Sequence, residues 1–323
     1  NFVVRIPMRT FVGFNSSLQQ EHFYENYLET EVWPNMLAQA QKQHIPMVLI
    51  NGRLSEKSLH KALRLPKLAL PAYQALTGVV AQSAEDAERF TQLGSRILGI
   101  SGNIKFDQRP NAAQIQEAQA LKTQWPDKKI IILASSREGE EALVLEAWRR
   151  APVAGALLVV VPRHPQRFDA VAALLQQEGW RFSRRSEGMP DHDTQVWLGD
   201  SMGEMVAYYT LADLAFIGGS LLPLGGQNLI EAAACGCPVI VGPHTFNFLQ
   251  ATDDAVTAGA ARRVGDAAGL AAAITQALLD PGELAEMRAA AAVFAAAHRG
   301  ATELTVGLIR SVLTVQRQGR EGR

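Results

Sequence analysis

Short runs of β-branched and apolar residues alternate with longer helical patterns from Pro46 to Val241, and this alternation constrains the fold more than any other feature of the chain. Each run has the length of one strand, and the helical segment between two runs can return the chain to the same edge of a sheet. Strands connected in this way lie parallel and are covered by helices on both faces. The pattern therefore predicts an α/β fold of the Rossmann type.

A polar segment divides these runs into two series, and a chain of 323 residues is larger than one hydrophobic core normally holds. We therefore predict two domains, an incomplete one over 1–106 and a complete one over 128–323 that ends in helices. Residues 107–127, with two prolines and a helical Ala/Gln-rich stretch, are interpreted as the linker. The expected strands are 46–50, 78–82 and 96–100 in the first domain, and 129–134, 156–161, 194–198, 214–217 and 238–241 in the second.

Composition excludes several classes of partner. A formal net charge of −1 gives no electrostatic footprint for nucleic acid, so none is expected to bind. No run approaches the roughly 18 apolar residues of a membrane span, so we expect a soluble chain. Cys235 and Cys237 have no second pair that would complete a zinc site, and we expect both to be reduced, buried residues of a cytosolic protein.

Polar residues gather directly after the expected strands of the second domain, where ligands bind in open α/β sheets. After the first of these strands, the run 135–139 fits either an anion site at a helix start or a plain serine cap. After the second strand, two prolines stiffen a turn that carries Arg163. This arginine suits phosphate recognition, although an arginine in a turn is usually solvated.

The later strand ends are richer in glycine. The run 201–204 fits a capping box, but its Gly203 is a poor helix former and favours close approach of the backbone to a ligand. Four glycines in 218–226 let backbone N–H groups approach a phosphate or sugar. Glu231 fits the partner of a helix cap at Asn228, and it is also placed to accept both hydroxyls of a ribose. Together these strand ends predict a nucleotide site.

The first domain carries charged residues of its own near its strands. Glu29 and Glu31 precede a Trp-Pro helix entry, and the runs 51–55 and 101–107 follow later strands. Charges that face an interdomain cleft suit an anionic substrate. The alternative is a set of surface salt bridges that contribute little to stability.

Seven strings of residues stand in the same order as in the Kdo transferase family of lipopolysaccharide synthesis, where Kdo is 3-deoxy-D-manno-octulosonic acid. The chain resembles this family from about Glu29 to its C-terminal region. The resemblance implies a GT-B fold, in which two Rossmann-like domains with parallel sheets face a cleft, with the N-terminal domain incomplete here. It also implies inverting transfer of Kdo from CMP-Kdo to a lipid A precursor (lipid IVA), without a metal or other cofactor. The strings are ETEVWPN (29–35), NIKFD (103–107), PRHP (162–165), GDSMGEM (199–205), GGSL (218–221), GGQNLIE (225–231) and GPHTFNF (242–248).

The resemblance also implies roles for single residues and a location. Glu29 and Lys105 match positions expected to stabilise the transition state. The family resemblance places the enzyme peripherally at the cytoplasmic face of the bacterial inner membrane, beside its lipid acceptor. The residues expected to hold the CMP part of the donor are Pro162, Arg163, Met202, Gly203, Glu204, Asn228, Leu229, Ile230 and Glu231.

The chain departs from the family pattern at its N-terminus. Residues 1–28 do not resemble the family, and no match is found for its membrane-associating N-terminus or for the Ser-Val-Gly-Glu-like segment that carries the expected general base. We therefore expect an N-terminally incomplete chain that binds the donor without transferring Kdo. Two alternatives stay open, namely a nucleotide-sugar epimerase of GT-B architecture and a non-catalytic nucleotide-binding remnant.

Overall fold

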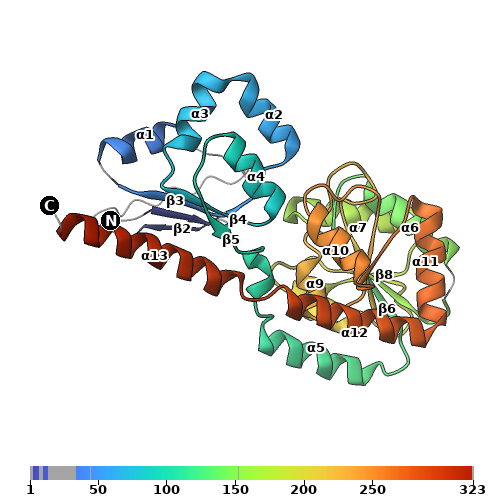
Figure 1. Ribbon diagram of the computed structural model, residues 1–323. Helices are drawn as coiled ribbons and strands as arrows, with labels where there is room; N and C mark the ends of the chain where they lie inside the picture. The colour runs from blue at the N-terminus through green and yellow to red at the C-terminus, as the bar shows by residue number, and fades with distance from the viewer. Residues whose placement is uncertain (1–2, 7–9, 14–33, 44, 152, 322–323) are drawn as a thin grey trace. The chain divides into compact units, whose positions relative to one another are not determined.

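The computed structural model describes residues 3–6, 10–13, 34–43, 45–151 and 153–321, with side chains from residue 35 to residue 312 of these ranges. The chain divides into two compact units, drawn in Figure 1. Unit 1 comprises Asn1–Asp107 and His298–Arg323, and unit 2 comprises Gln108–Ala297. Each unit is an α/β structure with one sheet.

Unit 1 holds a five-stranded sheet in the order β2-β1-β3-β4-β5. The strands β1, β3, β4 and β5 are parallel, and β2 pairs antiparallel with β1 at the edge. The strands are β1 (Val3–Ile6), β2 (Thr10–Gly13), β3 (Met47–Gly52), β4 (Gly78–Ala81) and β5 (Ile97–Ile100); the helices are α1 (Pro34–Lys42), α2 (Glu56–Arg64), α3 (Pro66–Gln74), α4 (Ala84–Gln92), the 3-10 turn η1 (Ile104–Asp107) and α13 (Ala301–Glu321).

Local sequence explains how these elements begin and end. Ser83 caps α4 by accepting the N–H of Asp86, and Gly94 adopts φ 80° just after the helix, so a serine cap and a glycine stop mark the two ends. One face of the sheet packs against α1 to α4 around Val79 and Phe90. The other face is covered by α13, whose Leu308 packs against it.

Unit 2 holds a seven-stranded parallel sheet in the order β12-β11-β10-β6-β7-β9-β8, with helices on both faces (Figure 1). Its central strands are fully buried runs, as a doubly covered parallel sheet requires. The strands are β6 (Ile130–Ser136), β7 (Leu157–Pro162), β8 (Phe182–Arg184), β9 (Val196–Leu198), β10 (Leu214–Ile217), β11 (Val239–Val241) and β12 (Ala261–Arg263); the helices are α5 (Ala112–Gln124), α6 (Glu140–Arg150), α7 (Phe168–Gln177), α8 (Met205–Leu211), α9 (Ile230–Ala234), α10 (Leu249–Thr257), α11 (Ala267–Leu279) and α12 (Pro281–Ala297), with 3-10 turns η2 (Pro165–Arg167) and η3 (Arg185–Glu187).

The division of the chain differs from the predicted boundaries at two places. The expected linker 107–127 contains α5, which packs against α8 of unit 2 and is anchored by Lys122, whose Nζ lies 2.8 Å from Oδ2 of Asp213. The last helix, α13, belongs to unit 1 instead of the C-terminal domain. Its start is capped by the carboxylate of Asp107, which accepts the N–H of Gly300 at 2.6 Å. Tertiary contacts of this kind leave no signal in local composition.

Candidate functional site

The ends of β6, β10 and β11 in unit 2 are packed so closely that two glycines are required. A Cβ on Gly218 would lie 2.4 Å from the carbonyl oxygen of Ser135, and one on Gly242 would lie 2.2 Å from that of Ser220. Ser220 is fully buried, and its hydroxyl accepts the N–H of Gly242 at 2.8 Å. The strand ends at which the sequence predicts a site therefore form one rigid edge of the sheet.

The loop after β10 is held by a buried carboxylate that the sequence did not single out. Glu140, the first residue of α6, is 0% exposed and accepts three backbone N–H groups, from Gly219 at 2.5 Å, Ser220 at 3.1 Å and Leu221 at 3.0 Å. Burial raises the pKa of Glu140, and the hydrogen bonds from Gly219 and Leu221 oppose that rise. Glu140 thus fixes the backbone at the start of the glycine-rich loop.

The structure corrects the serine-cap interpretation of the run 135–139, whereas the anion site stays a prediction. The N-cap of α6 is Gly139, at φ 83° and without a side-chain hydrogen bond, so no serine caps the helix. Ser136 instead donates to Glu141 at 2.9 Å. An anion at this helix start is unfavourable because the buried carboxylates of Glu140 and Glu141 already occupy the first turn.

A second loop, 243–248, clamps the far end of the glycine-rich loop. The Asn247 side chain donates to the carbonyl oxygen of Leu224 at 3.1 Å and to that of Gly226 at 3.4 Å. Its own N–H donates to the carbonyl of Gly225 at 2.9 Å. The glycine-rich loop is therefore fixed at both ends by side chains, which prepares its backbone for a ligand.

The predicted capping box at 201–204 is wrong. The hydroxyl of Ser201 lies 2.9 Å from that of Tyr208, and Glu204 accepts from Arg185 at 3.0 Å. Gly203 adopts φ 82°, and a Cβ there would meet nothing within 4 Å. The backbone conformation alone therefore favours glycine here, and close approach of this backbone to a ligand stays a prediction.

Asp200 anchors the same loop. Its carboxylate accepts from Arg184 at 2.7 Å and from the Ser186 hydroxyl at 2.6 Å. Burial raises the pKa of Asp200, but the hydrogen bonds from Ser186 and Arg184 lower it by more, so the net pKa lies below the ordinary value. The loop that carries Met202 and Glu204 is thereby tied to the edge of the sheet at β8.

The helix cap expected at Asn228 lies one residue too early, because the N-cap of α9 is Leu229, which makes no side-chain hydrogen bond. The Asn228 side-chain oxygen instead accepts the N–H of Ile230, the first residue of the helix, at 3.1 Å. Leu229 and Ile230 are each 1% exposed, so only their backbone faces a ligand. Glu231 is half-buried, and no donor to its carboxylate is found among the described residues. Burial without a compensating partner raises the pKa of Glu231.

Arg163 stands at the end of β7. Its N–H donates to the carbonyl of Ser136 at 3.0 Å, while its half-buried guanidinium has no ion-pair partner within the described part of the chain. Pro162 is buried in the strand, and Met202 is 58% exposed. All the predicted donor-site residues therefore follow the carboxyl ends of β7, β9 and β10 of one parallel sheet. Such an edge can hold a phosphate by a cation and a diol by a carboxylate.

Lys105 lies in unit 1, on η1, and Glu29 lies outside the described residues. The turn is fixed by two amide side chains, since Asn103 accepts the N–H of Lys105 at 3.0 Å and Asn51 accepts that of Ile104 at 3.1 Å. Asn51 is 1% exposed at φ 51°, a conformation that asparagine tolerates better than most residues.

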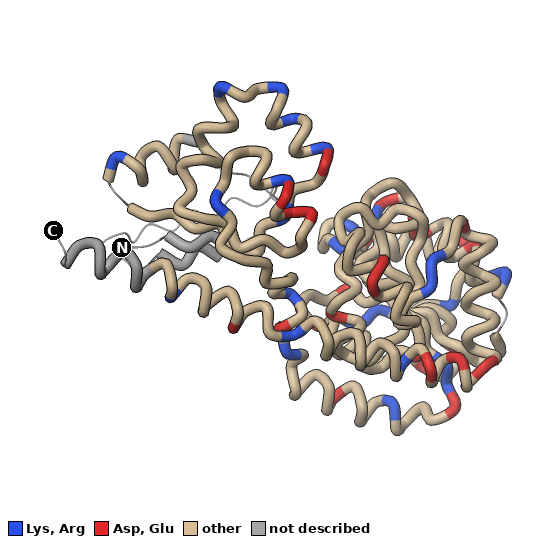
Figure 2. Tube along the Cα trace, in the orientation of Figure 1, with Lys and Arg blue, Asp and Glu red and all other residues tan. Residues whose placement is uncertain are grey.

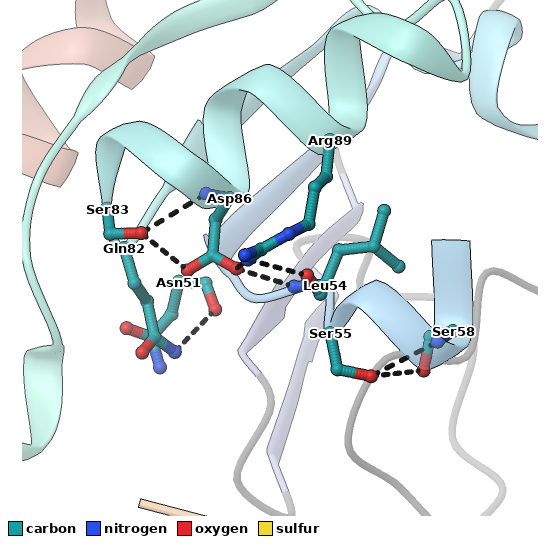
Figure 3. A network of polar contacts seen from close by, with 8 residues as sticks. All are labelled: Asn51, Leu54, Ser55, Ser58, Gln82, Ser83, Asp86 and Arg89. Carbon is teal, nitrogen blue, oxygen red and sulfur yellow. Dashed lines mark hydrogen bonds and ion pairs between the residues drawn. The ribbon is translucent and has the colours of Figure 1, made fainter. Parts of the chain in front are cut away.

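Figure 3 shows the network of polar contacts that supports Asn51. Gln82 donates to the carbonyl of Asn51 at 3.0 Å. Asp86, 6% exposed, accepts the N–H of Leu54 at 2.9 Å and the hydroxyl of Ser83 at 3.2 Å. The loops after β3 and β4 are therefore joined by buried hydrogen bonds and not by surface salt bridges alone.

Both cysteines are free; Cys237 is buried as predicted, whereas Cys235 is only half-buried. Burial raises the pKa of Cys235 to about 11 and that of Cys237 still further, so both are protonated near neutral pH. Within the described residues no helix combines the length and apolarity needed to cross a membrane.

Comparisons with known proteins agree with this architecture. Residues 26–108 match the family model described as 3-deoxy-D-manno-octulosonic-acid transferase (kdotransferase), and residues 169–293 match that of glycosyl transferases group 1. A 3-deoxy-D-manno-octulosonic acid transferase of Bordetella pertussis is 44% identical over 296 residues, covering 88% of this chain and 68% of the relative. One from Haemophilus influenzae is 41% identical, covering 68% of this chain and about half of the relative, 53%.

Solved structures point the same way. The C-terminal CMP-Kdo binding domain of WaaA from Acinetobacter baumannii aligns with 57% of this chain and 98% of its own length, at a TM-score of 0.53 and 34% identity. HepE from Anabaena, solved with UDP, aligns with 86% of this chain and 75% of its own length at a TM-score of 0.56, and at 16% identity it shows the fold alone. The chain therefore belongs to the 3-deoxy-D-manno-octulosonic acid transferase family, GT-B glycosyltransferases of lipopolysaccharide biosynthesis.

Proposed function

We propose that this chain carries the donor site and part of the catalytic machinery of an enzyme that transfers Kdo from CMP-Kdo to a lipid A precursor such as lipid IVA, at the cytoplasmic face of the inner membrane. One observation carries the proposal: the residue strings shared with the family stand at the strand ends of unit 2. The part of the chain that aligns with the CMP-Kdo binding domain of WaaA, 57% of it, is 34% identical to that domain. The family assignment favours a transferase over the epimerase alternative.

The donor binds through its CMP part. Arg163, without an ion-pair partner among the described side chains, pairs with the phosphate, and the backbone of 202–204 and 228–229 supplies further N–H groups. The Glu231 carboxylate accepts hydrogen bonds from the ribose hydroxyls. These hydroxyls supply the donors that the carboxylate lacks among the described residues. The raised pKa of Glu231 fits a carboxylate that receives its hydrogen-bond donors only when the nucleotide binds.

The transfer itself is a single displacement. A hydroxyl oxygen of the acceptor sugar bonds to the anomeric carbon of Kdo from the face opposite to the phosphate, while the bond from that carbon to the phosphate oxygen breaks. CMP leaves, and the hydroxyl proton passes to a general base. Lys105 stabilises the negative charge that develops on the phosphate, Glu29 stabilises the transition state, and no metal takes part.

Calorimetry on the full chain tests the donor site. CMP is expected to bind, and Arg163→Ala is expected to weaken CMP binding by more than ~1 kcal/mol, the scale of a charge-assisted hydrogen bond. Arg150→Ala is the matched control, because this exposed arginine on α6 pairs only with Glu146. Equal CMP affinity in Arg163→Ala and in the unaltered chain would remove Arg163 from the site.

A transfer assay with CMP-Kdo and lipid IVA, read by mass spectrometry of the lipid, tests the activity. Kdo-modified lipid supports the transferase. CMP binding without a Kdo-modified lipid would instead favour the non-catalytic remnant.

A further inference from the structure

Three large apolar side chains stand exposed within six residues where α2 meets α3. Leu63, Leu65 and Leu68 are 41%, 60% and 62% exposed. We name residues 56–70 the α2–α3 elbow. Monomeric proteins rarely leave contiguous apolar side chains in water, because burial of each would be favourable.

Local geometry explains why the core does not use these leucines. Leu65 ends α2 and Pro66 begins α3, so the chain turns sharply between the two helices. The core of unit 1 takes Leu59, 5% exposed and one turn before Leu63 on the same side of α2, and Tyr73, 8% exposed, near the end of α3. The exposed leucines are the ones nearest the bend, and this bend is the corner of the elbow.

Positive charge surrounds this corner. Lys57, Lys61, Arg64 and Lys67 are all exposed, and Glu56 is the single acidic residue of the elbow, which leaves a net charge of +3 in a chain whose formal charge is −1. Figure 2 shows these blue positions along α2 and α3, with one red position at the start of α2. Within the described residues none of the four cations has an ion-pair partner.

We propose that the α2–α3 elbow is a docking surface for an anionic lipid bilayer. Its leucines enter the boundary between headgroups and acyl chains, and its lysine and arginine side chains pair with lipid phosphates. Charge complementarity selects this occupant over a second copy of the chain, because two elbows of charge +3 repel each other. The inference rests on the proposed function in one respect, since a lipid acceptor places the substrate in the bilayer that the elbow contacts.

The test measures binding of the full chain to sedimented vesicles. Vesicles of phosphatidylcholine mixed with phosphatidylglycerol are expected to bind the chain, and vesicles of phosphatidylcholine alone are expected to bind it at least tenfold less. Leu65→Ser/Leu68→Ser and Lys61→Gln/Arg64→Gln/Lys67→Gln are each expected to weaken binding to the mixed vesicles about tenfold or more.

Matched controls separate the elbow from general stickiness. Leu279→Ser/Val293→Ser removes two apolar side chains of unit 2 that are 70% and 69% exposed, and Arg149→Gln/Arg150→Gln removes two exposed cations of α6. Both controls are expected to bind vesicles as the unaltered chain does. Equal binding to both vesicle types, or equal losses in elbow and control variants, would overturn the proposal.

CMP calorimetry on the same variants keeps the two proposals apart. The elbow variants are expected to retain CMP affinity, because the proposed donor site lies in unit 2, and an unchanged thermal unfolding curve shows that unit 1 still folds. Vesicle binding through the elbow in a chain that does not bind CMP would leave the docking surface standing while the proposed donor site fails.

Discussion

Replacing Glu140 by glutamine tests whether the buried carboxylate shapes the nucleotide site. The substitution keeps the shape of the side chain but turns one acceptor oxygen into an NH2 group. In the native arrangement Oε2 accepts the N–H of Gly219, and Oε1 accepts those of Ser220 and Leu221. Whichever way the amide turns, at least one backbone N–H faces another donor.

The magnitude follows from the hydrogen bonds lost. A hydrogen bond to a charged group contributes about 1.5–3 kcal/mol, and a buried unsatisfied donor costs about 1–3 kcal/mol. Removing the buried charge offsets part of this loss of free energy, because burial disfavours the ionised form of Glu140, as its raised pKa shows. We expect a net local destabilisation of about 2 kcal/mol, equivalent to roughly thirtyfold faster amide exchange.

Hydrogen exchange read by mass spectrometry provides the assay. Peptides that contain 219–221 are expected to exchange faster in Glu140→Gln, with a parallel fall in CMP affinity. Glu138→Gln is the control, since Glu138 stands two residues before Glu140, has 84% side-chain exposure and, among the described residues, forms an ion pair with Arg167 alone. Unchanged exchange and CMP affinity in Glu140→Gln, or equal effects in Glu138→Gln, would refute the reasoning.

Three further predictions concern single side chains. Glu231→Gln is expected to keep the stability of the chain but lose CMP affinity. Burial raises the pKa of Glu231 and ribose would bind the ionised carboxylate, so the CMP affinity of the unaltered chain should fall as pH drops through that raised pKa. Calorimetry at several pH values should find no such fall in the variant. The folded-state pKa of Asp200 lies below its ordinary value, so the contribution of Asp200 to stability is present above about pH 4 and is lost as pH falls through the folded pKa. The free energy of unfolding of Asp200→Asn should therefore fall less steeply with acid, and equal slopes of free energy against pH would contradict this. Asn51→Gly keeps the backbone at φ 51° but deletes the acceptor for Ile104, so amide exchange in 103–107 should accelerate while CMP affinity holds, and unchanged exchange would show that the bond is dispensable.

Much of the fold could be predicted because each buried strand of a parallel sheet is a short, continuous apolar run in the sequence. The buried run of β10 spans Leu214–Ile217, the very residues expected, and the α4 cap at Ser83 is confirmed. The strands β8 and β12 were missed because each has three residues, at an edge of the sheet, with arginine among them. Strands this short carry no periodicity to detect.

The site was predicted only as far as the strand ends. Sequence order indicates which loops meet at one edge, but it does not show that Glu140 reaches the backbone of 219–221, some eighty positions away. The capping-box pattern at 201–204 failed for a related reason. Long-range partners, Arg185 for Glu204 and Tyr208 for Ser201, took up the side chains that a local rule assigned to a helix end.

The return of α13 to unit 1 has a consequence for how the chain is made. Unit 2 is continuous in sequence, so it can close its sheet on the ribosome as soon as Ala297 has emerged. Unit 1 must wait, because one face of its sheet, including Val80, stays uncovered until Leu308 has been synthesised. Unit 1, whose strands precede unit 2 in the sequence, is thus completed after unit 2, and a chaperone that shields exposed strands would act on β3 to β5 while residues 108–297 are synthesised.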